Sequence, residues 1–456
     1  MDAESVRTNF NEIKSSYNIN FELKEEQIEV AVAALQKRNV VCLLPTGFGK
    51  TMCMVLPVIL QMDKNPITLV ISPLSSLIDD QMSTLENWNI KCAKITSRSD
   101  MQTDVIRGIS NGEYNLIFSS PESVLKPFWK KVFLGSIWQS RLCMICVDEA
   151  HCISEWGEDF RTDYQSLHEL RSFFSAPVMA LTATSTQKVK DDIMETLQLT
   201  DADTDIIFKS PDRPNIFIEI RKRDSTDFEI SLKWLIDYIR ENGVNSKKIV
   251  VYCRSIDRVS DLFLCLKDNL QLHAYANQEK KASNLLVEMF HKSTSEDSKE
   301  RILKEFKRED SRIRCLIATV ALGMGLDIRD IDLVIHIGCP KSVLSYWQEA
   351  GRCARDGRDG FSFVLYDNFT LSLKTTGKCI RDIIKNTSTC IRRQIVNSLT
   401  VDNFKEDTLD TKKCEGCDLQ QCRCPACKCC AECSKNCTCQ ERSKFSIEEF
   451  LQTPRD

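Results

Sequence analysis

The chain has 456 residues, of which 42% are hydrophobic and 28% charged, as in a soluble globular protein with two or three domains. Its 61 basic and 65 acidic residues give a formal charge of −4, which excludes a uniformly basic nucleic-acid-coating protein; a polyanion would need a locally positive channel. The first ten residues are polar and no run approaches the roughly 18 apolar residues of a membrane span, so we expect an intracellular protein with no membrane segment.

Short apolar runs alternate with longer amphipathic stretches over residues 1–209, which we assign to a first domain. The stretches between the runs, such as Glu25–Gln36 and Thr51–Gln61, are compatible with helices. This alternation predicts a parallel sheet with helices on both faces. The runs expected to form buried strands are Val40–Leu44, Ile67–Ile71, Asn115–Phe118, Leu142–Val147 and Val178–Leu181.

The pattern then restarts. Ser210–Asn215 contains two prolines and is predicted to link the first domain to a second one, residues 210–367. The predicted fold class is therefore α/β, with two tandem parallel-sheet domains. A helical, cysteine-rich module is expected at 368–440 and a tail at 441–456. The expected strands of the second domain are Ile249–Tyr252, Cys315–Ala318, Leu333–Ile337 and Phe361–Tyr366.

A candidate phosphate-binding loop follows the first predicted strand. Leu44 stands where the full phosphate-loop pattern requires glycine, so the shorter form Thr46-Gly47-Phe48-Gly49-Lys50-Thr51 is present. Glycines allow the backbone to approach phosphates closely, Lys50 would reach the β- and γ-phosphates, and Thr51 would ligate Mg²⁺. The alternative is an ordinary connection between a strand and a helix.

An acidic pair and an aromatic loop are adjacent in the sequence. Asp148 and Glu149 end the fourth predicted strand, where Asp148 would hold Mg²⁺ through water and Glu149 would orient or deprotonate the attacking water. A solvated helix N-terminus is the structural alternative, which the preceding apolar strand disfavours. Trp156, Phe160 and Arg161 follow, and side chains of these types can stack on unpaired bases.

Two arginines in the second domain are candidates for stabilising the transition state. Arg352 and Arg355 are three residues apart, which predicts that they share one helical face. An arginine of this kind contributes roughly 10³ to 10⁵ in turnover. Two arginines that merely face solvent are the alternative. Because these arginines belong to the second domain, hydrolysis would require the two domains to close.

These motifs together resemble the catalytic core of a RecQ-type DNA helicase of superfamily 2, from Leu23 to about Cys422. The resemblance implies two RecA-like domains that bind ATP and Mg²⁺ and move 3′ to 5′ on single-stranded or forked DNA. The motifs that carry it are Leu23–Gln27, Ser72–Leu77 with Asp80 and Gln81, Ser120–Glu122, Asp148–His151, Trp156–Arg161, Thr182–Thr184, Asp212–Asn215, Tyr252–Ser255, Ala318–Asp327 and Gln348–Gly357.

The resemblance also implies roles for particular residues. Lys24 and Gln27 would recognise adenine, Asp327 would belong to the nucleotide site, and Gln348 would act with the two arginines. The residues implied in DNA binding, besides the aromatic loop, are Ser76, Arg254, Ser255 and Thr319.

The chain departs from the family pattern at several positions. Lys24 replaces an arginine, which weakens stacking on adenine. Glu155 and Glu158 stand where the family has Gln and His, so the aromatic loop becomes locally acidic. Ala354 replaces a glycine between the two arginines, a mild change if the position is helical.

Twelve of the 23 cysteines lie between Cys379 and Cys439. In an intracellular chain such a cluster points to metal rather than to disulfides. Similarity to the RecQ zinc module implies that four of these cysteines bind one Zn²⁺. The seven from Cys424 to Cys439 exceed what that site needs; a second zinc site, a redox-sensitive metal-buffering tail and, less favoured, an iron–sulfur cluster all stay open. The implied zinc ligands are Cys390, Cys414, Cys417 and Cys422.

The expected partners are single-stranded, forked or junction DNA and proteins of repair, recombination and replication, for a monomeric nuclear enzyme. Because no winged-helix domain is expected after the zinc module, translocation is a stronger expectation than unwinding. A different class of function stays open, a DNA-annealing or scaffold protein that binds through its basic helical region and zinc tail. An RNA helicase of the same superfamily is disfavoured by the aromatic loop and the zinc module.

Overall fold

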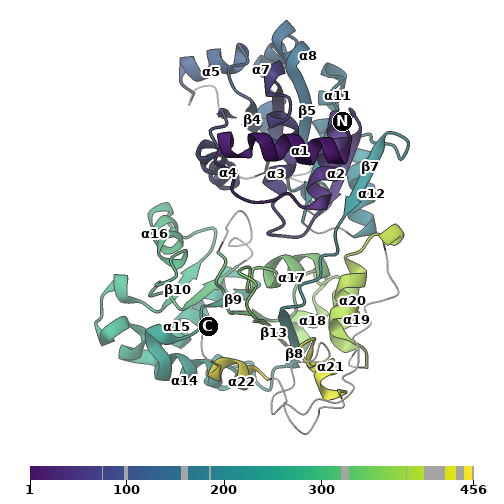
Figure 1. Ribbon diagram of the computed structural model, residues 1–456. Coiled ribbons are helices and arrows are strands. Elements are labelled where there is room, and N and C mark those ends of the chain that lie inside the picture. The colour runs from purple at the N-terminus through teal and green to yellow at the C-terminus, as the bar shows by residue number, and fades with distance from the viewer. Residues whose placement is uncertain are drawn as a thin grey trace. The chain divides into compact units, whose positions relative to one another are not determined.

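The computed structural model describes residues 1–73, 75–96, 101–155, 163–183, 186–319, 328–386, 388–404, 427–437 and 446–453, except for the side chains of Ser76 and Glu155. The chain divides into two compact units (Figure 1). The first contains residues 1–211 and 400–404, and the second contains 212–399 and the described residues after 405. In the described ranges no helix is both long enough and apolar enough to cross a membrane.

A parallel sheet of seven strands forms the centre of the first unit, in the order β3-β4-β2-β5-β6-β1-β7. Every residue of β1, β2 and β6 is buried, as expected for strands covered on both faces. The strands are β1 (Asn39–Leu43), β2 (Ile67–Ile71), β3 (Cys92–Ile95), β4 (Leu116–Ser119), β5 (Leu142–Val147), β6 (Val178–Thr182) and β7 (Thr204–Phe208).

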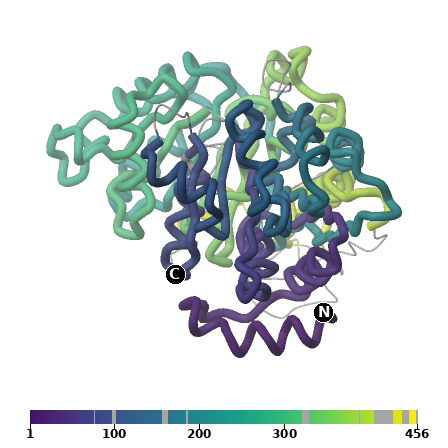
Figure 2. The backbone as a smooth tube through the Cα atoms, turned by 90° about the horizontal axis from the view of Figure 1, so that it is seen from above, coloured from purple at the N-terminus to yellow at the C-terminus, as the bar shows by residue number. Residues whose placement is uncertain are grey.

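Helices of the first unit pack on this sheet through apolar stripes. The N-terminal helix α1 (Ala3–Ile13) lies beside α2 (Figure 1); Figure 2 shows the same N-terminal helix from above. It buries Val6 and Phe10 in the core that α2 and α3 share with β1, and Arg7 pairs with Glu25 of α2. The other α-helices are α2 (Glu25–Leu35), α3 (Lys50–Ile59), α4 (Ser75–Asn87), α5 (Thr103–Ser110), α6 (Pro121–Val124), α7 (Pro127–Phe133), α8 (Ser136–Arg141), α9 (Cys152–Glu155), α11 (Leu170–Phe173) and α12 (Gln187–Thr196).

The second unit is built on a parallel sheet of six strands, in the order β10-β11-β9-β12-β13-β8. The strands are β8 (Ile216–Lys222), β9 (Ile249–Cys253), β10 (Val287–Phe290), β11 (Cys315–Ala318), β12 (Leu333–Ile337) and β13 (Gly360–Tyr366). The helices are α13 (Phe228–Ser231), α14 (Lys233–Asn242), α15 (Ile256–Leu270), α16 (Glu296–Phe306), α17 (Val343–Ala350), α18 (Asn368–Ser372), α19 (Lys378–Lys385), α20 (Ile391–Ser398), α21 (Ala431–Lys435) and α22 (Ile447–Gln452).

These two sheets confirm the predicted fold class, and every strand predicted from the sequence is present. Residues 368–399 belong to the second unit, and the predicted boundaries of a cysteine-rich module at 368–440 stay a prediction. The segment 400–404 belongs to the first unit, where Phe404 stacks on Phe208 at 4.8 Å between ring centroids and the Asp402 amide donates to Gln187 Oε1 at 3.0 Å. The last helix, α22, inserts Phe450 into the core of the second unit.

Candidate nucleotide and metal sites

The phosphate loop connects β1 to α3 in a backbone conformation that requires glycine. Gly47 and Gly49 have φ values of +77° and +90°, in the left-handed region that residues with a side chain rarely adopt. Gly49 is the N-cap of α3, so Lys50 and Thr51 occupy its first turn. The free N–H groups of a first turn form a site for an anion such as phosphate.

The predicted adenine-recognition residues contact this loop. Gln27 is buried, and its Nε2 donates to the carbonyls of Phe48 at 3.3 Å and Gly49 at 3.1 Å. Lys24 Nζ donates to the Phe48 carbonyl at 2.9 Å and lies 4.1 Å from the centroid of the Phe48 ring. Burial lowers the pKa of Lys24. Both side chains therefore link α2 to the phosphate loop, and adenine recognition by them stays a prediction.

Three segments of the candidate nucleotide site meet at the carboxyl end of the first sheet. The phosphate loop follows β1 and the acidic pair follows β5, while β6 lies between these strands. Two backbone hydrogen bonds join all three: Leu44 N donates to Thr182 O at 3.0 Å, and Ala150 N donates to Leu181 O at 2.9 Å. The carboxyl ends of parallel strands are the usual place for a ligand site in such sheets.

Asp148 is a buried carboxylate held by two donors. It is 2% exposed; Gln81 Nε2 donates to Oδ2 at 2.8 Å and the Glu149 amide donates to Oδ1 at 3.0 Å. Burial and the nearby Glu149 raise the pKa of Asp148 to about 6, although Lys50 opposes the shift. A hard divalent cation favours carboxylate oxygens, and its charge would offset the cost of this buried anion. The residues therefore fit Mg²⁺.

Glu149 lies in a strained backbone position. Its φ is +48°, which costs a residue with a side chain roughly 1–2 kcal/mol and is typical of functional sites. Its Oε2 lies 3.2 Å from His151 Nδ1, and that nitrogen is also 3.0 Å from Thr182 Oγ1. Burial lowers the pKa of His151. His151 thus connects the acidic pair to the end of β6.

Roles for three residues were missing from the sequence interpretation, although each lies in a quoted motif. Gln81, which accompanies the Ser72–Leu77 motif in the sequence, donates to Asp148. His151 and Thr182 contact each other behind Glu149. Their proximity to the acidic pair depends on how β2, β5 and β6 pair, which spacing in the sequence does not reveal.

We expect Asp148→Asn to stabilise the first unit at neutral pH. A folded-state pKa of about 6, above the ordinary 3.8, means that this carboxyl favours folding below about pH 4 and loses that contribution as the pH rises through 6. Asparagine removes the buried charge and should raise the free energy of unfolding by about 1–3 kcal/mol at pH 7. Urea unfolding at pH 7 and pH 5 measures the difference; a gain that does not shrink at pH 5 would contradict the raised pKa.

The two candidate arginines follow a helix rather than lying within one. Helix α17 ends at Ala350, so the prediction that Arg352 and Arg355 share one helical face is wrong. We call residues 351–358 the arginine turn. Arg352 is buried at 7% exposure, and Arg355 is half-buried with its Nε donating to Gly351 O at 3.4 Å. Gln348, on the last turn of α17, is also half-buried.

Ala354 lies in the left-handed region, with φ of +46°. Its replacement of a glycine is therefore not the mild change expected for a helical position, because the Cβ is strained there. Its amide donates to Ile331 O at 2.7 Å, which holds the turn against the loop before β12.

We expect Ala354→Gly to stabilise the second unit by about 0.5–1 kcal/mol, since relief of strain at positive φ exceeds the extra chain entropy of glycine in the unfolded state. Chemical denaturation of the variant beside Ala350→Gly, in the adjoining helix, measures this difference. The helical substitution should destabilise by a similar amount. A destabilised Ala354→Gly variant would contradict the strain.

The candidate DNA-binding residues of the second unit are held by contacts within that unit. Arg254, at the end of β9, donates to Cys339 O at 2.7 Å and to Oγ1 of Thr376 and Thr375, both at 2.8 Å. Ser255 caps α15 by accepting from Arg258 N at 3.3 Å. Thr319 follows β11, with its amide donating to Phe290 O at 3.3 Å. DNA contact by these residues stays a prediction.

Several predicted site residues lie outside the described residues. Ser76 lies in α4, but its side chain is not among those described. The others outside the described ranges are Trp156, Phe160, Arg161, Asp327, Cys414, Cys417 and Cys422.

Four cysteines meet in the second unit. The Sγ atoms of Cys390, Cys429, Cys430 and Cys433 all lie within 4.8 Å of one another. Cys390 Sγ is 3.5 Å from Cys429 Sγ and 4.0 Å from Cys430 Sγ. Tetrahedral Zn²⁺ with Zn–S bonds of roughly 2.3 Å separates its sulfurs by about 3.8 Å, so the group fits zinc. Hydrogen bonds among the four thiols lower the pKa of Cys390 and Cys430 and raise the pKa of Cys429 and Cys433, so a bound metal would have to displace the protons of the latter pair.

This four-cysteine group differs from the predicted ligand set. It shares Cys390 with that set, but its other members come from the seven cysteines that seemed surplus to one zinc. Cys390 is the N-cap of α20, and its Sγ accepts from Arg393 N at 3.4 Å. The partners lie 39–43 residues later in the sequence, a separation that no local spacing pattern identifies.

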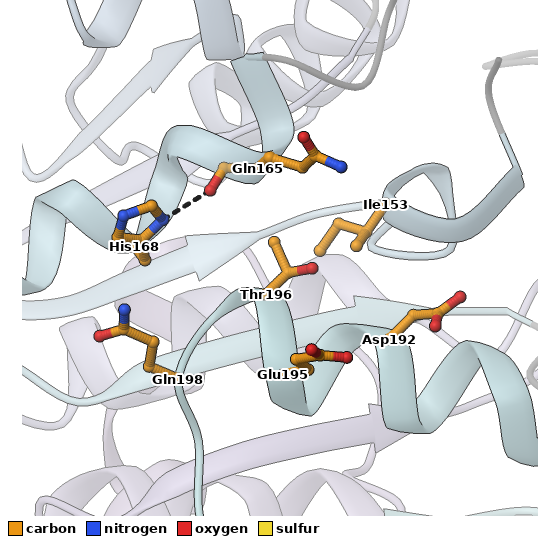
Figure 3. Close-up of a pocket in the computed structure, with 7 residues that line it drawn as sticks. All are labelled: Ile153, Gln165, His168, Asp192, Glu195, Thr196 and Gln198. Carbon is orange, nitrogen blue, oxygen red and sulfur yellow. Dashed lines mark hydrogen bonds between the residues drawn. The ribbon is translucent and has the colours of Figure 1, made fainter. Parts of the chain in front are cut away.

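A separate cleft of about 350 Å³ lies in the first unit beside α9 and α12 (Figure 3). Its polar lining includes Asp192 and Glu195, and Ser154 donates a hydrogen bond to Asp192. His168 Nδ1 donates to the Gln165 carbonyl at 2.5 Å. Among the described residues, none of those predicted to bind nucleotide or DNA lines this cleft, and its carboxylates disfavour phosphate.

Two helicase families match the chain. The DEAD/DEAH box helicase family matches residues 24–192, and the helicase conserved C-terminal domain matches residues 231–357. These ranges correspond to the first unit and to much of the second.

Curated relatives extend this match. The ATP-dependent DNA helicase Q-like 2 of Arabidopsis thaliana is 32% identical over 364 residues, 78% of this chain and 47% of that protein. The ATP-dependent DNA helicase RecQ of Haemophilus influenzae is 30% identical over 347 residues, 75% of this chain and 51% of that protein. The chain thus spans about half the length of these relatives.

The fold is also that of solved helicases. The structure of the Mycobacterium smegmatis helicase Lhr bound to ssDNA and AMP-PNP aligns with a TM-score of 0.61 and 18% identity, over 84% of this chain and 50% of that one. At this identity the likeness shows the fold alone. With two helicase families matched in order, and RecQ-type helicases as relatives over three quarters of its length, the chain belongs to the RecQ-type helicases of superfamily 2.

Proposed function

We propose that this chain is an ATP-dependent DNA helicase or translocase that moves 3′ to 5′ on single-stranded or forked DNA. The observation that carries the proposal is that the phosphate loop, the buried acidic pair and Thr182 meet at the carboxyl end of the first sheet. Hydrolysis of a nucleoside triphosphate requires this combination of amide donors, a lysine and carboxylates.

The residues of the first unit can divide the chemistry of ATP hydrolysis among them. The phosphate loop and Lys50 would bind the phosphates, while Thr51 and Asp148 would hold Mg²⁺. When bound, that ion neutralises charge on the β- and γ-phosphate oxygens. Glu149, fixed by its strained backbone and by His151, would orient the attacking water and accept its proton.

The second unit would contribute Arg352, Arg355 and Gln348 to hydrolysis. The first unit would bind DNA through Ser76 and the loop of Trp156, Phe160 and Arg161, and the second through Arg254, Ser255 and Thr319. The names of the relatives state that they act on DNA. Roles in repair, recombination and replication in the nucleus, with partners among the proteins of those processes, belong to this proposal. So does Zn²⁺ at the four-cysteine group.

We expect Lys50→Ala to abolish DNA-stimulated ATP hydrolysis while the protein stays folded, because Lys50 is half-buried and makes no described structural ion pair. Phosphate release should be titrated with single-stranded, forked and duplex DNA, and with RNA of the same sequence. In the wild-type protein, single-stranded or forked DNA should increase the rate of phosphate release most. Retained turnover in Lys50→Ala would refute the nucleotide site, and stronger activation by RNA would refute the choice of DNA.

A DNA-annealing function is the second candidate, favoured by basic side chains near the four-cysteine group. Lys378 and Lys385 of α19 and Arg393 of α20 are exposed in the second unit. If single-stranded DNA fails to accelerate phosphate release but the protein speeds annealing of complementary strands, DNA annealing without ATP-driven movement is the better account of its function. Strand annealing by Lys50→Ala protein provides the direct comparison.

A further inference from the structure

The start of the second unit binds the arginine turn through side chains of Arg213 and Asn215. Arg213 donates from Nη1 to Gly351 O at 2.9 Å and from Nη2 to Cys353 O at 3.0 Å and Ala354 O at 2.8 Å. Asn215 Nδ2 donates to Ala354 O at 3.0 Å and Arg358 O at 2.7 Å. Two side chains thus bind four backbone carbonyls of this turn.

These carbonyls need donors because the helix before them has ended. The last carbonyls of a helix and of the turn after it lack partners within the helix. The turn also contains Ala354 at positive φ, so its backbone conformation is not one that alanine prefers. The direction of the Arg352 and Arg355 side chains depends on this backbone. Arg213 and Asn215 therefore determine where both arginines project.

A third side chain connects the same segment to the four-cysteine group. Arg392 is 4% exposed and lies two residues after Cys390 in α20. Its Nη1 donates to Asp212 Oδ1 at 2.9 Å and to Arg213 O at 2.6 Å, and its Nη2 donates to Ile216 O and to Cys429 O, the latter at 3.0 Å.

Arg392 thus binds a backbone carbonyl of the cysteine group on one side and the backbone of the segment that carries Arg213 on the other. In addition, Ile218 of β8 forms a parallel bridge with Cys430. Metal binding would hold the chain at Cys429 and Cys430 in place, because it ties three cysteines of one short segment to Cys390.

We propose that Arg213 and Asn215 are positioning residues for the arginine turn, and that Arg392 makes their placement depend on metal binding at the four-cysteine group. The catalytic consequence rests on the proposed function, since it requires that an arginine of the turn acts in ATP hydrolysis. The structural consequence, a turn whose order depends on the metal, stands apart from any activity.

The first test separates kcat from nucleotide binding. Arg213→Ala and Asn215→Ala should each lower the kcat of DNA-stimulated hydrolysis about ten- to a hundredfold, since a small misplacement of a catalytic group costs that much. The dissociation constant for ATP should change less than threefold, because the phosphate loop belongs to the first unit.

Arg223→Ala is the matched control. Arg223 is a buried arginine of the second unit that, like the half-buried Arg213, donates to backbone carbonyls, those of Ser225 at 3.1 Å and Thr226 at 2.6 Å. It makes no described contact with the arginine turn. It should destabilise the unit similarly and leave kcat within about twofold of wild type. Equal losses of kcat in all three variants would reduce Arg213 and Asn215 to structural residues and overturn the proposal.

The second test measures backbone order by hydrogen–deuterium exchange, without turnover. Removal of metal from the full chain with a chelator should speed exchange of amides in residues 351–358 at least tenfold, and added Zn²⁺ should reverse this. Peptides from β10, which lies at the far edge of the sheet from β8, should change much less than residues 351–358.

Arg392→Lys should speed exchange of the arginine turn even with metal bound, because the lysine ammonium donates from a single nitrogen and cannot span the two segments that Nη1 and Nη2 of the guanidinium reach. Unchanged exchange in residues 351–358 after metal removal, with the metal loss verified by atomic absorption, would overturn the link through Arg392. If wild-type protein shows no DNA-stimulated hydrolysis at all, the proposed function fails, but the exchange experiment still decides this structural link.

Discussion

Arg352→Ala is expected to lower the rate of DNA-stimulated ATP hydrolysis by about 10³- to 10⁵-fold, the range found where an arginine stabilises the phosphoryl-transfer transition state. Arg352 is 7% exposed, in a turn held by Arg213 and Asn215, so its side chain has a defined position. Single-turnover measurement at saturating ATP and single-stranded DNA gives the rate of the chemical step.

Two comparisons make this result interpretable. Arg352→Lys retains the charge but loses the planar fork of donors, so it should recover only a small part of the activity. Arg355→Ala shows whether one arginine or both take part, since Arg355 is less buried. ATP affinity should stay within a few fold of wild type in each variant. Turnover by Arg352→Ala within tenfold of wild type would exclude the catalytic role.

Removal of metal is expected to unfold the segment 427–437 and to destabilise the second unit. A structural Zn²⁺ held by four thiolates contributes about 10–16 kcal/mol of apparent binding free energy, which becomes free energy of folding. Of the described segments, 427–437 contains few large apolar side chains, so its place beside β8 depends on the cysteines. Thermal unfolding with and without a chelator, followed by circular dichroism, should show a markedly lower transition temperature after chelation.

Cysteine variants decide which ligand set holds the metal. The double variant Cys429→Ser with Cys433→Ser should lose the tightly bound zinc if the group seen in the structure is the site. The double variant Cys414→Ser with Cys417→Ser should keep it. The reverse result would favour the ligands implied by family resemblance. Loss of half of the metal in each variant would indicate two sites.

Two features of the first unit lower its free energy of unfolding, as is typical of active sites. Asp148 is buried with a raised pKa, and Glu149 occupies a strained backbone conformation next to it. Neither arrangement favours folding without a ligand, so both are maintained by the surrounding sheet. Gln81 and His151 add the polar contacts that keep these two carboxylates in place.

The meeting of the phosphate loop and the acidic pair could be predicted because these residues are close in sequence or follow strands directly. The phosphate loop is one continuous segment, and the acidic pair follows an apolar run that can only be a buried strand. The arginine turn could not be predicted in the same way. Helical spacing suggested a shared face for Arg352 and Arg355, but Gly351 ends the helix, and carbonyl contacts from Arg213 hold a different backbone.

The two-sheet fold and the interior strands of each sheet could be predicted from the apolar runs alone. The predicted strands are β4, β2, β5, β6 and β1 in the first unit, and β11, β9, β12 and β13 in the second, all of which have a neighbour on both sides. A strand in the middle of a parallel sheet is buried on both faces, so it must be a continuous apolar run that a sequence reveals. The strands that were not predicted are β3, β7, β8 and β10, which form the four edges of the two sheets.

The edge strands, the arginine turn and the four-cysteine group depend on contacts between segments that are distant in the sequence. Edge strands such as Cys92–Ile95 and Thr204–Phe208 are partly exposed and have mixed composition, so they carry no continuous apolar run. Cys390 meets cysteines about 40 residues away because Arg392 and β8 bring their segments together. Burial of a strand requires consecutive apolar residues, which can be recognised in the sequence. A contact between distant segments requires no such local pattern, so it cannot be recognised there.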